Sequence, residues 1–246
     1  MKLTIDDRIV ELAEGATVLD GVNRLGIPLP QLCKDPERAP LGACRTCLVH
    51  VEGQRGLPAS CHLPAREGMV VSTEHADALR VRKAVLDLTL SMLTPQNGFA
   101  QLSDAGARHG LLEPRWAPLH RFEVDASKSF FVLDREACIL CGRCAVACDD
   151  VQQIGAIALV GRGHATKVGV FGDSTMASSV CTSCGQCVAT CPTGALRPKE
   201  APAKIARTVE TTCPYCGVGC GIAVSVFAGE SRGGRSPLLP INRRAS

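Results

Sequence analysis

Alternating apolar and polar residues open the chain and predict a β-hairpin. Residues 2–6 and 8–12 both alternate, and the Asp6–Asp7 pair between them suits a tight turn. A short stretch with helical spacing follows, and Gly26 provides its stop. The apolar face of this helix is formed by Val18, Val22 and Leu25. The fold is therefore expected to begin with a strand pair and one helix.

Two more strands and a long helix are predicted downstream. Residues 47–53 and 69–73 have the composition of strands, and residues 76–90 have the spacing of an amphipathic helix. The economical fold for residues 1–76 is a small mixed sheet crossed by one helix, which is a β-grasp shape. The fold class that we expect for the whole chain is α+β.

Further strands frame the second half of the chain. Residues 130–134 predict a strand that leads directly into a run of cysteines, so this run begins on rigid backbone. Residues 154–160 and 167–170 predict a strand pair around a turn at 161–164. Neither dinucleotide-binding nor phosphate-loop spacing follows the glycines of this turn, so we expect no nucleotide site there.

The cysteines carry the strongest chemical signal. The chain has 15 of them, and many fall in two copies of the pattern C-x2-C-x2-C-x3-C. The copies are Cys138, Cys141, Cys144 and Cys148, and then Cys181, Cys184, Cys187 and Cys191. Each copy predicts a [4Fe–4S] cluster, because thiolates at every third residue can wrap one cube. Zinc is the alternative, but it favours two separated pairs of ligands.

The last cysteine of each copy is predicted to serve the cluster of the other copy. It follows the third cysteine by four residues, where a helix is expected to have begun, and so it faces away from its own loop. The first predicted ligand set is Cys138, Cys141, Cys144 and Cys191. The second is Cys181, Cys184, Cys187 and Cys148. The two runs are thus expected to form one 2[4Fe–4S] ferredoxin domain.

A third group of cysteines lies on the predicted N-terminal sheet. Its members, spaced C-x10-C-x2-C-x13-C, are Cys33, Cys44, Cys47 and Cys61. Four thiolates on two loops suit a [2Fe–2S] rhomb, and the small residues Gly42 and Ala43 leave room for backbone N–H groups near the sulfides. A zinc knuckle is the alternative. His50 and His62 flank the site and are interpreted as ordinary residues, because four thiols are already within reach.

Cysteine-rich chains are often secreted, but nothing in this sequence indicates export. The N-terminus lacks the basic and apolar segments of a signal peptide, and no run is apolar enough to span a membrane. We therefore expect a cytoplasmic location, reduced thiols and metal ligation. The net charge of +3 does not indicate nucleic-acid binding. Aromatic residues make up only 3%, so aliphatic side chains and inorganic clusters must fill the interior.

The N-terminal cysteine spacing resembles the [2Fe–2S] domain that opens the large iron–sulfur subunit of respiratory complex I, some hydrogenases and NAD-linked formate dehydrogenases. In those families the following helix leads into a His-x3-Cys-x2-Cys-x5-Cys motif for a further [4Fe–4S] cluster. Residues 91–102 contain no cysteine or histidine, and His109 and His120 cannot hold a cubane without thiolates. That cluster is expected to be absent. Electrons would pass directly between the rhomb and the cubanes, or the rhomb would be a side branch.

A last group of cysteines resembles the opening of molybdenum- or tungsten-bis-pterin oxidoreductases, especially formate dehydrogenase large subunits. It comprises Cys213, Cys216 and Cys220, spaced C-x2-C-x3-C. In that family a fourth cysteine downstream completes a [4Fe–4S] cluster beside the pterin, and none follows here before Ser246. An incomplete cluster site is expected, with a zinc or labile three-cysteine site as the alternative.

These features divide the chain into five predicted parts. They are a [2Fe–2S] β-grasp ferredoxin domain (1–76), a helical connector with a degenerate cluster motif (77–120), a 2[4Fe–4S] ferredoxin domain (121–202), the start of a [4Fe–4S] bis-pterin oxidoreductase domain (203–228) and a disordered tail (229–246).

The resemblance implies electron transfer as the function. Electrons from formate, oxidised at a bis-pterin molybdenum or tungsten domain outside this chain, would pass through the two [4Fe–4S] clusters to the [2Fe–2S] cluster. A flavin- and NAD-binding diaphorase-type subunit would accept them, for the reaction formate + NAD⁺ to CO₂ + NADH. The chain itself is expected to bind no flavin, NAD or pterin, and so to be one component of an oxidoreductase. The alternatives are a stand-alone diaphorase-type subunit of an NAD-reducing hydrogenase or complex I-like assembly, and a zinc-stapled scaffold.

Overall fold

The structure is a computed structural model, and it describes residues 1–36, 38–93, 100–116, 122–199, 205–212, 217–219 and 221–227. Some sequence-based predictions lie outside these residues. They concern Cys213, Cys216, Cys220, His120 and the tail 229–246. Below, residues 1–74 are called the N-terminal part and residues 122–199 the second part.

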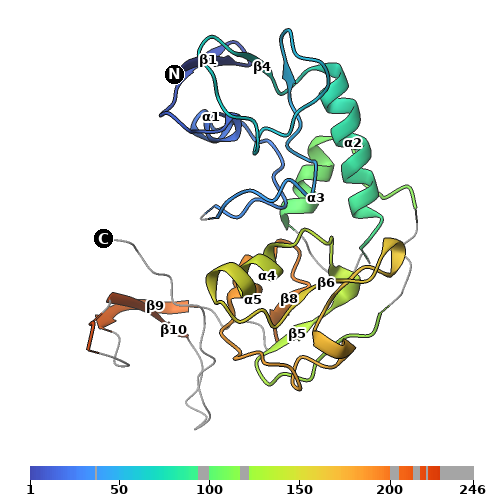
Figure 1. Ribbon diagram of the computed structural model, residues 1–246, viewed down its shortest axis with the longest axis vertical. Coiled ribbons are helices and arrows are strands. Elements are labelled where there is room, and N and C mark those ends of the chain that lie inside the picture. The colour runs from blue at the N-terminus through green and yellow to red at the C-terminus, as the bar shows by residue number, and fades with distance from the viewer. Residues whose placement is uncertain are drawn as a thin grey trace.

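The N-terminal part is built on a four-stranded mixed sheet (Figure 1). Its strands lie in the order β2 (Arg8–Glu11), β1 (Lys2–Ile5), β4 (Val70–Ser72) and β3 (His50–Val51). β1 pairs parallel with β4 and antiparallel with β2. Both aspartates of the β1–β2 turn have left-handed φ, 46° and 61°, as a two-residue hairpin of this kind requires. The predicted hairpin and mixed sheet are confirmed, and the β-grasp name stays a prediction.

One helix, α1 (Val18–Arg24), packs its apolar face against this sheet. Thr17 begins it with a capping box: the Thr17 hydroxyl accepts from the Asp20 N–H at 3.3 Å, and the Thr17 N–H donates to the Asp20 carboxylate at 2.8 Å. Val22 is fully buried in the core of the N-terminal part. The predicted helix and its buried face are therefore confirmed.

A helical hairpin connects the N-terminal part to the second part (Figure 1). α2 (Ala76–Leu90) has the predicted bounds, and α3 (Ala100–Arg108) packs against it. Leu86 of α2 and Leu102 of α3 are fully buried in a shared hydrophobic cluster. The sequence did not predict α3, because Gly106, a serine and an aspartate give it a weak intrinsic preference for helix.

Two antiparallel strand pairs frame the second part. β5 (Phe131–Leu133) pairs with β8 (Leu196–Pro198), and β6 (Ala158–Val160) pairs with β7 (Lys167–Gly169). The β5–β8 pair joins the residues that precede the first cysteine run to those that follow the second. The strand leading into the first run and the β6–β7 pair were predicted, whereas β8 was not.

A short helix accompanies each cysteine run. α4 (Arg143–Val146) continues into a π-helical turn, η2 (Ala147–Val151), which contains Cys148. α5 (Gln186–Thr190) ends immediately before Cys191. The remaining turns are 3-10 helices: η1 (Arg135–Ala137), η3 (Gly163–Ala165) and η4 (Phe171–Asp173). The predicted onset of helix before the last cysteine of each run is confirmed.

Beyond the second part, β9 (Ile205–Thr212) and β10 (Gly221–Phe227) form an antiparallel hairpin. The third predicted cysteine group falls in the connection of this hairpin, of which the structure describes only residues 217–219. No helix in the described stretches is long and apolar enough to cross a bilayer.

One hydrophobic cluster lies where the helical hairpin, the N-terminal part and the second part meet. It is formed by Leu32, Leu86, Leu93, Leu102, Ala105, Ala137 and Ala195. Cys44 packs against this cluster from the N-terminal part, and Cys138 and Cys191 pack against it from the second part. The fold thus brings two of the predicted ligand sets to one interface.

Candidate iron–sulfur centres

The N-terminal cysteines gather as two interacting pairs. Hydrogen bonding between Cys33 and Cys44 lowers the pKa of Cys44 to about 5 and raises the pKa of Cys33. Hydrogen bonding between Cys47 and Cys61 likewise lowers the pKa of Cys47 to about 6 and raises the pKa of Cys61. In each pair, hydrogen bonding therefore favours the thiolate form of one cysteine and the thiol form of the other. Two adjacent pairs of cysteine sulfurs suit the four-thiolate ligand set of a [2Fe–2S] cluster.

Two fully buried hydroxyl groups fix the loops that carry these sulfurs. Thr46 Oγ1 lies 3.0 Å from Cys44 Sγ and donates to the Pro30 carbonyl at 3.2 Å. Ser60 Oγ donates to the Cys47 carbonyl at 2.8 Å. These side chains set the positions of the sulfurs without being ligands, which is the usual work of residues that surround a metal centre.

The glycine predicted to favour this site, Gly42, has a steric reason to be small. Its φ is +65°, and a Cβ there would lie 2.8 Å from the His62 ring. His50 stacks instead on His75, with ring centroids 3.9 Å apart. Both histidines therefore have packing contacts of their own, in line with their interpretation as ordinary residues.

Two apolar cavities in the second part each draw cysteines from both runs. The first is lined by Cys138, Cys141, Cys144 and Cys191. The second is lined by Cys148, Cys181, Cys184 and Cys187. Aliphatic side chains line both cavities, with Leu133 at the first and Ile157 at the second. These groupings agree with the two predicted ligand sets, whose roles as ligands remain a prediction.

The two cysteine runs repeat the same backbone geometry. The N–H of Leu140 donates to Cys138 Sγ at 3.3 Å, and the N–H of Ser183 donates to Cys181 Sγ at 3.4 Å. Leu140 and Ser183 both have left-handed φ, 54° and 60°, and the glycines that cap α4 and α5 both have φ of 79°. This strained loop turns backbone donors toward sulfur, which suits thiolates that share the negative charge of a cluster.

The last cysteine of each run also accepts a backbone hydrogen bond. The N–H of Ala156 donates to Cys148 Sγ at 3.2 Å, and the N–H of Leu196 donates to Cys191 Sγ at 3.5 Å. Hydrogen bonds to the sulfurs stabilise the more negative, reduced state of a cluster and so raise its reduction potential.

Burial opposes ionisation of the thiols in the second part. It raises the pKa of Cys144 well above its ordinary value, raises that of Cys141, and raises that of Cys187 to about 12. Such thiols become thiolates when a metal supplies positive charge, so metal binding there must release protons. Among the described residues, no three candidate side chains converge closely enough to hold a single metal ion. The fit to clusters rests on the cavities, the thiols and the N–H donors.

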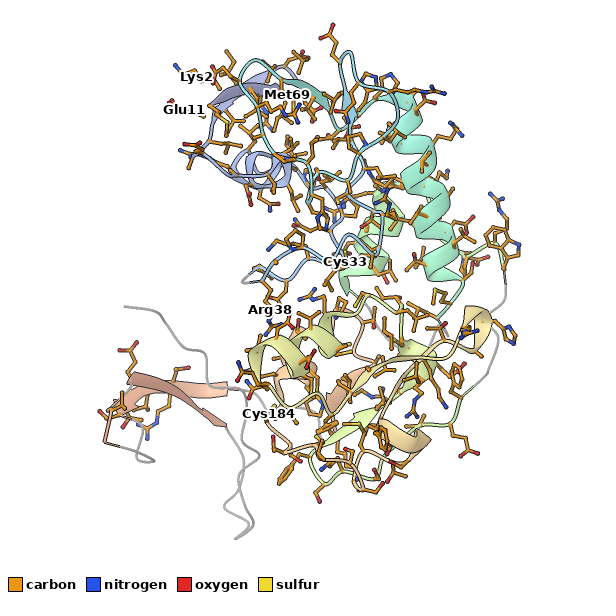
Figure 2. The ribbon with its side chains drawn as sticks, in the orientation of Figure 1. Lys2, Glu11, Cys33, Arg38, Met69 and Cys184 are labelled. Carbon is orange, nitrogen blue, oxygen red and sulfur yellow. The ribbon has the colours of Figure 1, made fainter. Side chains whose placement is uncertain are left out.

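The first cavity is the one beside the N-terminal cysteines. Burial is the largest cause of the raised pKa of Cys141, and a smaller contribution comes from the charge of Cys44. Leu41 and Ala43 line a groove together with Cys141 and Gly142. Cys184, by contrast, lines the second cavity and is exposed, and Figure 2 shows it in the second part, well below Cys33.

A charged clamp crosses the interface between the parts, and we define it as Asp35, Arg38, Arg143 and Thr190. Asp35 Oδ2 accepts from Arg38 Nη1 at 2.8 Å and from Thr190 Oγ1 at 2.5 Å. Arg143 Nη2 lies 3.6 Å from the same oxygen. Figure 2 shows Arg38 where the N-terminal loop meets the second part. The clamp was missed in the sequence, because no spacing links residues that only the fold brings together.

Three family descriptions match the chain in the order of its parts. Residues 1–76 match the 2Fe-2S iron-sulfur cluster binding domain, and residues 137–195 match the 4Fe-4S dicluster domain. Residues 206–236 match the molybdopterin oxidoreductase Fe4S4 domain. The predicted [2Fe–2S] and [4Fe–4S] ferredoxin domains, and iron–sulfur clusters as the cofactors, are thereby confirmed.

Curated relatives match most of the chain. The NADP-reducing hydrogenase subunit HndD of Solidesulfovibrio fructosivorans is 36% identical over 80% of this chain and 36% of its own length. One subunit of the NADH-quinone oxidoreductase of Rhizobium meliloti is 36% identical over 94% of this chain and 28% of its own length. The chain thus spans about a third of the length of these relatives.

A solved structure has a similar fold over most of its length. One chain of the NAD⁺-reducing [NiFe]-hydrogenase in the H₂-reduced state superposes with a TM-score of 0.74 at 28% sequence identity. The match covers 82% of this chain and 89% of that chain.

Proposed function

Because the chain is an iron–sulfur module of the kind found in NADH-quinone oxidoreductases and in related hydrogenases, we propose that it relays electrons along a direct line of three centres. The line runs between the [2Fe–2S] site and the second [4Fe–4S] site through the first. Bound iron–sulfur clusters supply the one-electron chemistry. The protein holds them close together, dry and in fixed orientation.

The observation that carries this proposal is the shared interface of two ligand sets. Cys44 packs against the same hydrophobic cluster as Cys138 and Cys191. The helical hairpin, which lacks cysteines, stands beside this contact and does not separate the two sites. The proposed route therefore needs no further cluster in the connector, and this contact supports direct transfer over the side-branch alternative.

The apolar lining of both cavities supports the same function. Leu133 and Leu196 are fully buried at the first cavity, and Phe131 and Met176 are buried at the second. Such walls exclude water, which lowers the reorganisation that each electron transfer demands and limits hydrolysis of the clusters. At the second site Cys184 is exposed, so that site is the accessible end of the line.

For the parent reaction we propose formate + NAD⁺ to CO₂ + NADH, with formate oxidised at a bis-pterin domain and NAD⁺ reduced on a flavin-binding partner. The support is the cysteine pattern of Cys213, Cys216 and Cys220, together with the molybdopterin oxidoreductase match over residues 206–236. The proposal includes the five predicted parts of the chain and the twelve cysteines predicted to bind the [2Fe–2S] cluster and the two [4Fe–4S] clusters. A cytoplasmic location also belongs to it, because the relay would act beside NAD⁺.

A second candidate is an electron-transfer subunit of an NAD-reducing hydrogenase. The observation that favours it is the solved hydrogenase chain, of which 89% is matched, whereas the curated relatives are matched over about a third of their length. Affinity purification from the natural host distinguishes the two candidates. Co-purifying formate-dependent reduction of NAD⁺ supports the first, and H₂-dependent reduction supports the second.

Two cysteine variants test the relay itself in anaerobically purified protein. The parent chain should contain about ten irons, with one [2Fe–2S] signal and coupled cubane signals in EPR after dithionite reduction. Cys148→Ser should remove the second cubane and leave about six irons, although Cys148 lies in the first run. Cys191→Ser should remove the first cubane. If each variant instead loses the cluster of its own run, the crossed ligand sets are wrong. Zinc in place of iron would refute the relay.

A further inference from the structure

A buried positive charge beside the [2Fe–2S] site lacks an ion-pair partner among the described residues. Arg82, in the middle of α2, is only 2% exposed. Its Nη2 donates to the carbonyl oxygens of Leu48 at 2.8 Å and Thr73 at 3.0 Å, both of which are uncharged. Its Nε is buried and has no hydrogen-bond acceptor among the described residues. Within the described part of the chain, no carboxylate lies close enough to form a salt bridge with Arg82.

Neither nearby carboxylate forms a salt bridge with Arg82 within the described part of the chain. Asp6 accepts from the N–H and the hydroxyl of Thr73, at 2.7 and 2.6 Å. Glu74 is exposed to water. Burial lowers the pKa of Arg82, while the charges of Glu74, Cys47 and Asp6 raise it. A guanidinium keeps its proton in proteins, so the site retains a full positive charge in a region of low dielectric.

A hydrogen bond places Arg82 beside the loop that carries the [2Fe–2S] cysteines. Leu48, whose carbonyl accepts from Arg82, directly follows Cys47, and a negative charge on Cys47 favours the charged form of Arg82. Cys47 in turn is paired with Cys61. Burying an unpaired charge is unfavourable, and so the counter-charge is expected in the loaded protein. A [2Fe–2S] cluster on four thiolates is negative when oxidised and gains one more negative charge on reduction.

We propose that Arg82 is the resident counter-charge of the [2Fe–2S] centre and raises its reduction potential by stabilising the reduced cluster. The inference rests on the proposed function, because it needs a [2Fe–2S] cluster on the N-terminal cysteines. Arg82 is a positioning and electrostatic residue, since it contacts the cluster loop through the Leu48 carbonyl and donates no ligand. A buried charge is poorly screened by salt, so its effect should persist at high ionic strength.

The test is an EPR redox titration of the [2Fe–2S] signal in the full, cluster-loaded chain. Arg82→Met should lower the ratio of reduced to oxidised cluster at least tenfold at a fixed ambient potential, which is 59 mV for one electron. Arg82→Lys keeps the positive charge, so its [2Fe–2S] reduction potential should stay close to that of the parent. The matched control is Arg80→Met on the same helix, because the Arg80 side chain is 74% exposed and should leave the potential unchanged.

Each outcome decides the proposal. A shift in Arg82→Met no larger than that in Arg80→Met, with the iron content intact, would overturn it. If Arg82→Met loses the signal, Arg82→Gln carries the same test, because glutamine keeps a donor for the Leu48 carbonyl without the charge. Loss of the signal in both neutral variants would assign Arg82 a structural role and overturn the proposal as well. A parent protein without any [2Fe–2S] signal would instead refute the proposed function.

Discussion

Removing the central carboxylate of the clamp tests whether the two parts must stay closed for electrons to pass directly. Asp35→Ala deletes the acceptor that two arginines and Thr190 share. Within the described residues, the substitution leaves Arg38 and Arg143 without a carboxylate partner, and the hydroxyl of Thr190 loses its acceptor. The packing of the hydrophobic cluster is untouched, so the change isolates the electrostatic contribution of the clamp.

The expected magnitude follows from the burial of the clamp. Exposed ion pairs contribute about 0–1 kcal/mol, whereas breaking a buried pair destabilises by about 3–5 kcal/mol. The three charged side chains are 12–15% exposed, so all three are largely buried. We expect Asp35→Ala to weaken the association of the two parts by about 2–4 kcal/mol. The ratio of closed to open protein should then fall by about 30- to 700-fold.

EPR of the dithionite-reduced protein measures this opening, because magnetic coupling between neighbouring clusters weakens as they separate. In Asp35→Ala the coupling between the [2Fe–2S] cluster and the first cubane should diminish while the iron content stays unchanged. Asp35→Asn keeps a hydrogen-bond acceptor, so its magnetic coupling should lie between that of Asp35→Ala and that of the parent. The matched control is Asp77→Ala, whose ion pair with Arg80 is exposed and should matter little. Unchanged coupling and melting temperature in Asp35→Ala would refute the role given to the clamp.

Three further predictions concern the ligand loops. Gly42→Ala should destabilise the [2Fe–2S] loop by about 1–3 kcal/mol, because its Cβ would clash with the His62 ring, and a lower melting temperature that His62→Ala partly restores would support this reasoning. In Gly185→Ala the added Cβ would have no described atom within 4 Å, but the φ of +79° strains any residue with a Cβ. The substitution should therefore destabilise the protein by about 1–2 kcal/mol through backbone strain alone, and an unchanged melting temperature would contradict this. Reconstitution of both kinds of cluster should weaken as the pH falls, because each cluster binds four thiolates and must displace protons from thiols whose pKa is raised. Hydrogen bonding and burial raise the pKa of Cys33 and Cys61 in the [2Fe–2S] site, and burial raises that of Cys187 to about 12 in the second cubane site. Iron content after reconstitution between about pH 6 and 9 checks this, and an iron content that does not change with pH would count against it.

Local patterns in the sequence were sufficient for much of the fold. The β1–β2 hairpin follows from alternation, and α1 and α2 follow from helical spacing; both are properties of neighbouring residues. The cysteine groupings also follow from local spacing, because a repeat of three residues and a helical step of four fix where the sulfurs point.

Features that depend on distant contacts could not be predicted. β8 is a strand only because Leu196–Pro198 pairs with β5, more than sixty residues earlier. α3 forms against α2 despite a glycine in its own sequence. The burial of Arg82 depends on which elements cover α2, and helical spacing alone does not indicate that. Each of these outcomes depends on tertiary packing, which outweighs local preference.

The shared cavities have a consequence for the durability of the second part. Because each cavity draws cysteines from both runs, a bound cluster acts as a cross-link that closes a long loop of the chain. By the loop-closure argument used for disulfides, a link of this length stabilises by about 4 kcal/mol, a contribution that disappears with the inorganic core. Oxidative loss of one cluster would therefore destabilise both cysteine runs. The second part would then unfold as one cooperative unit and become open to proteolysis as a whole.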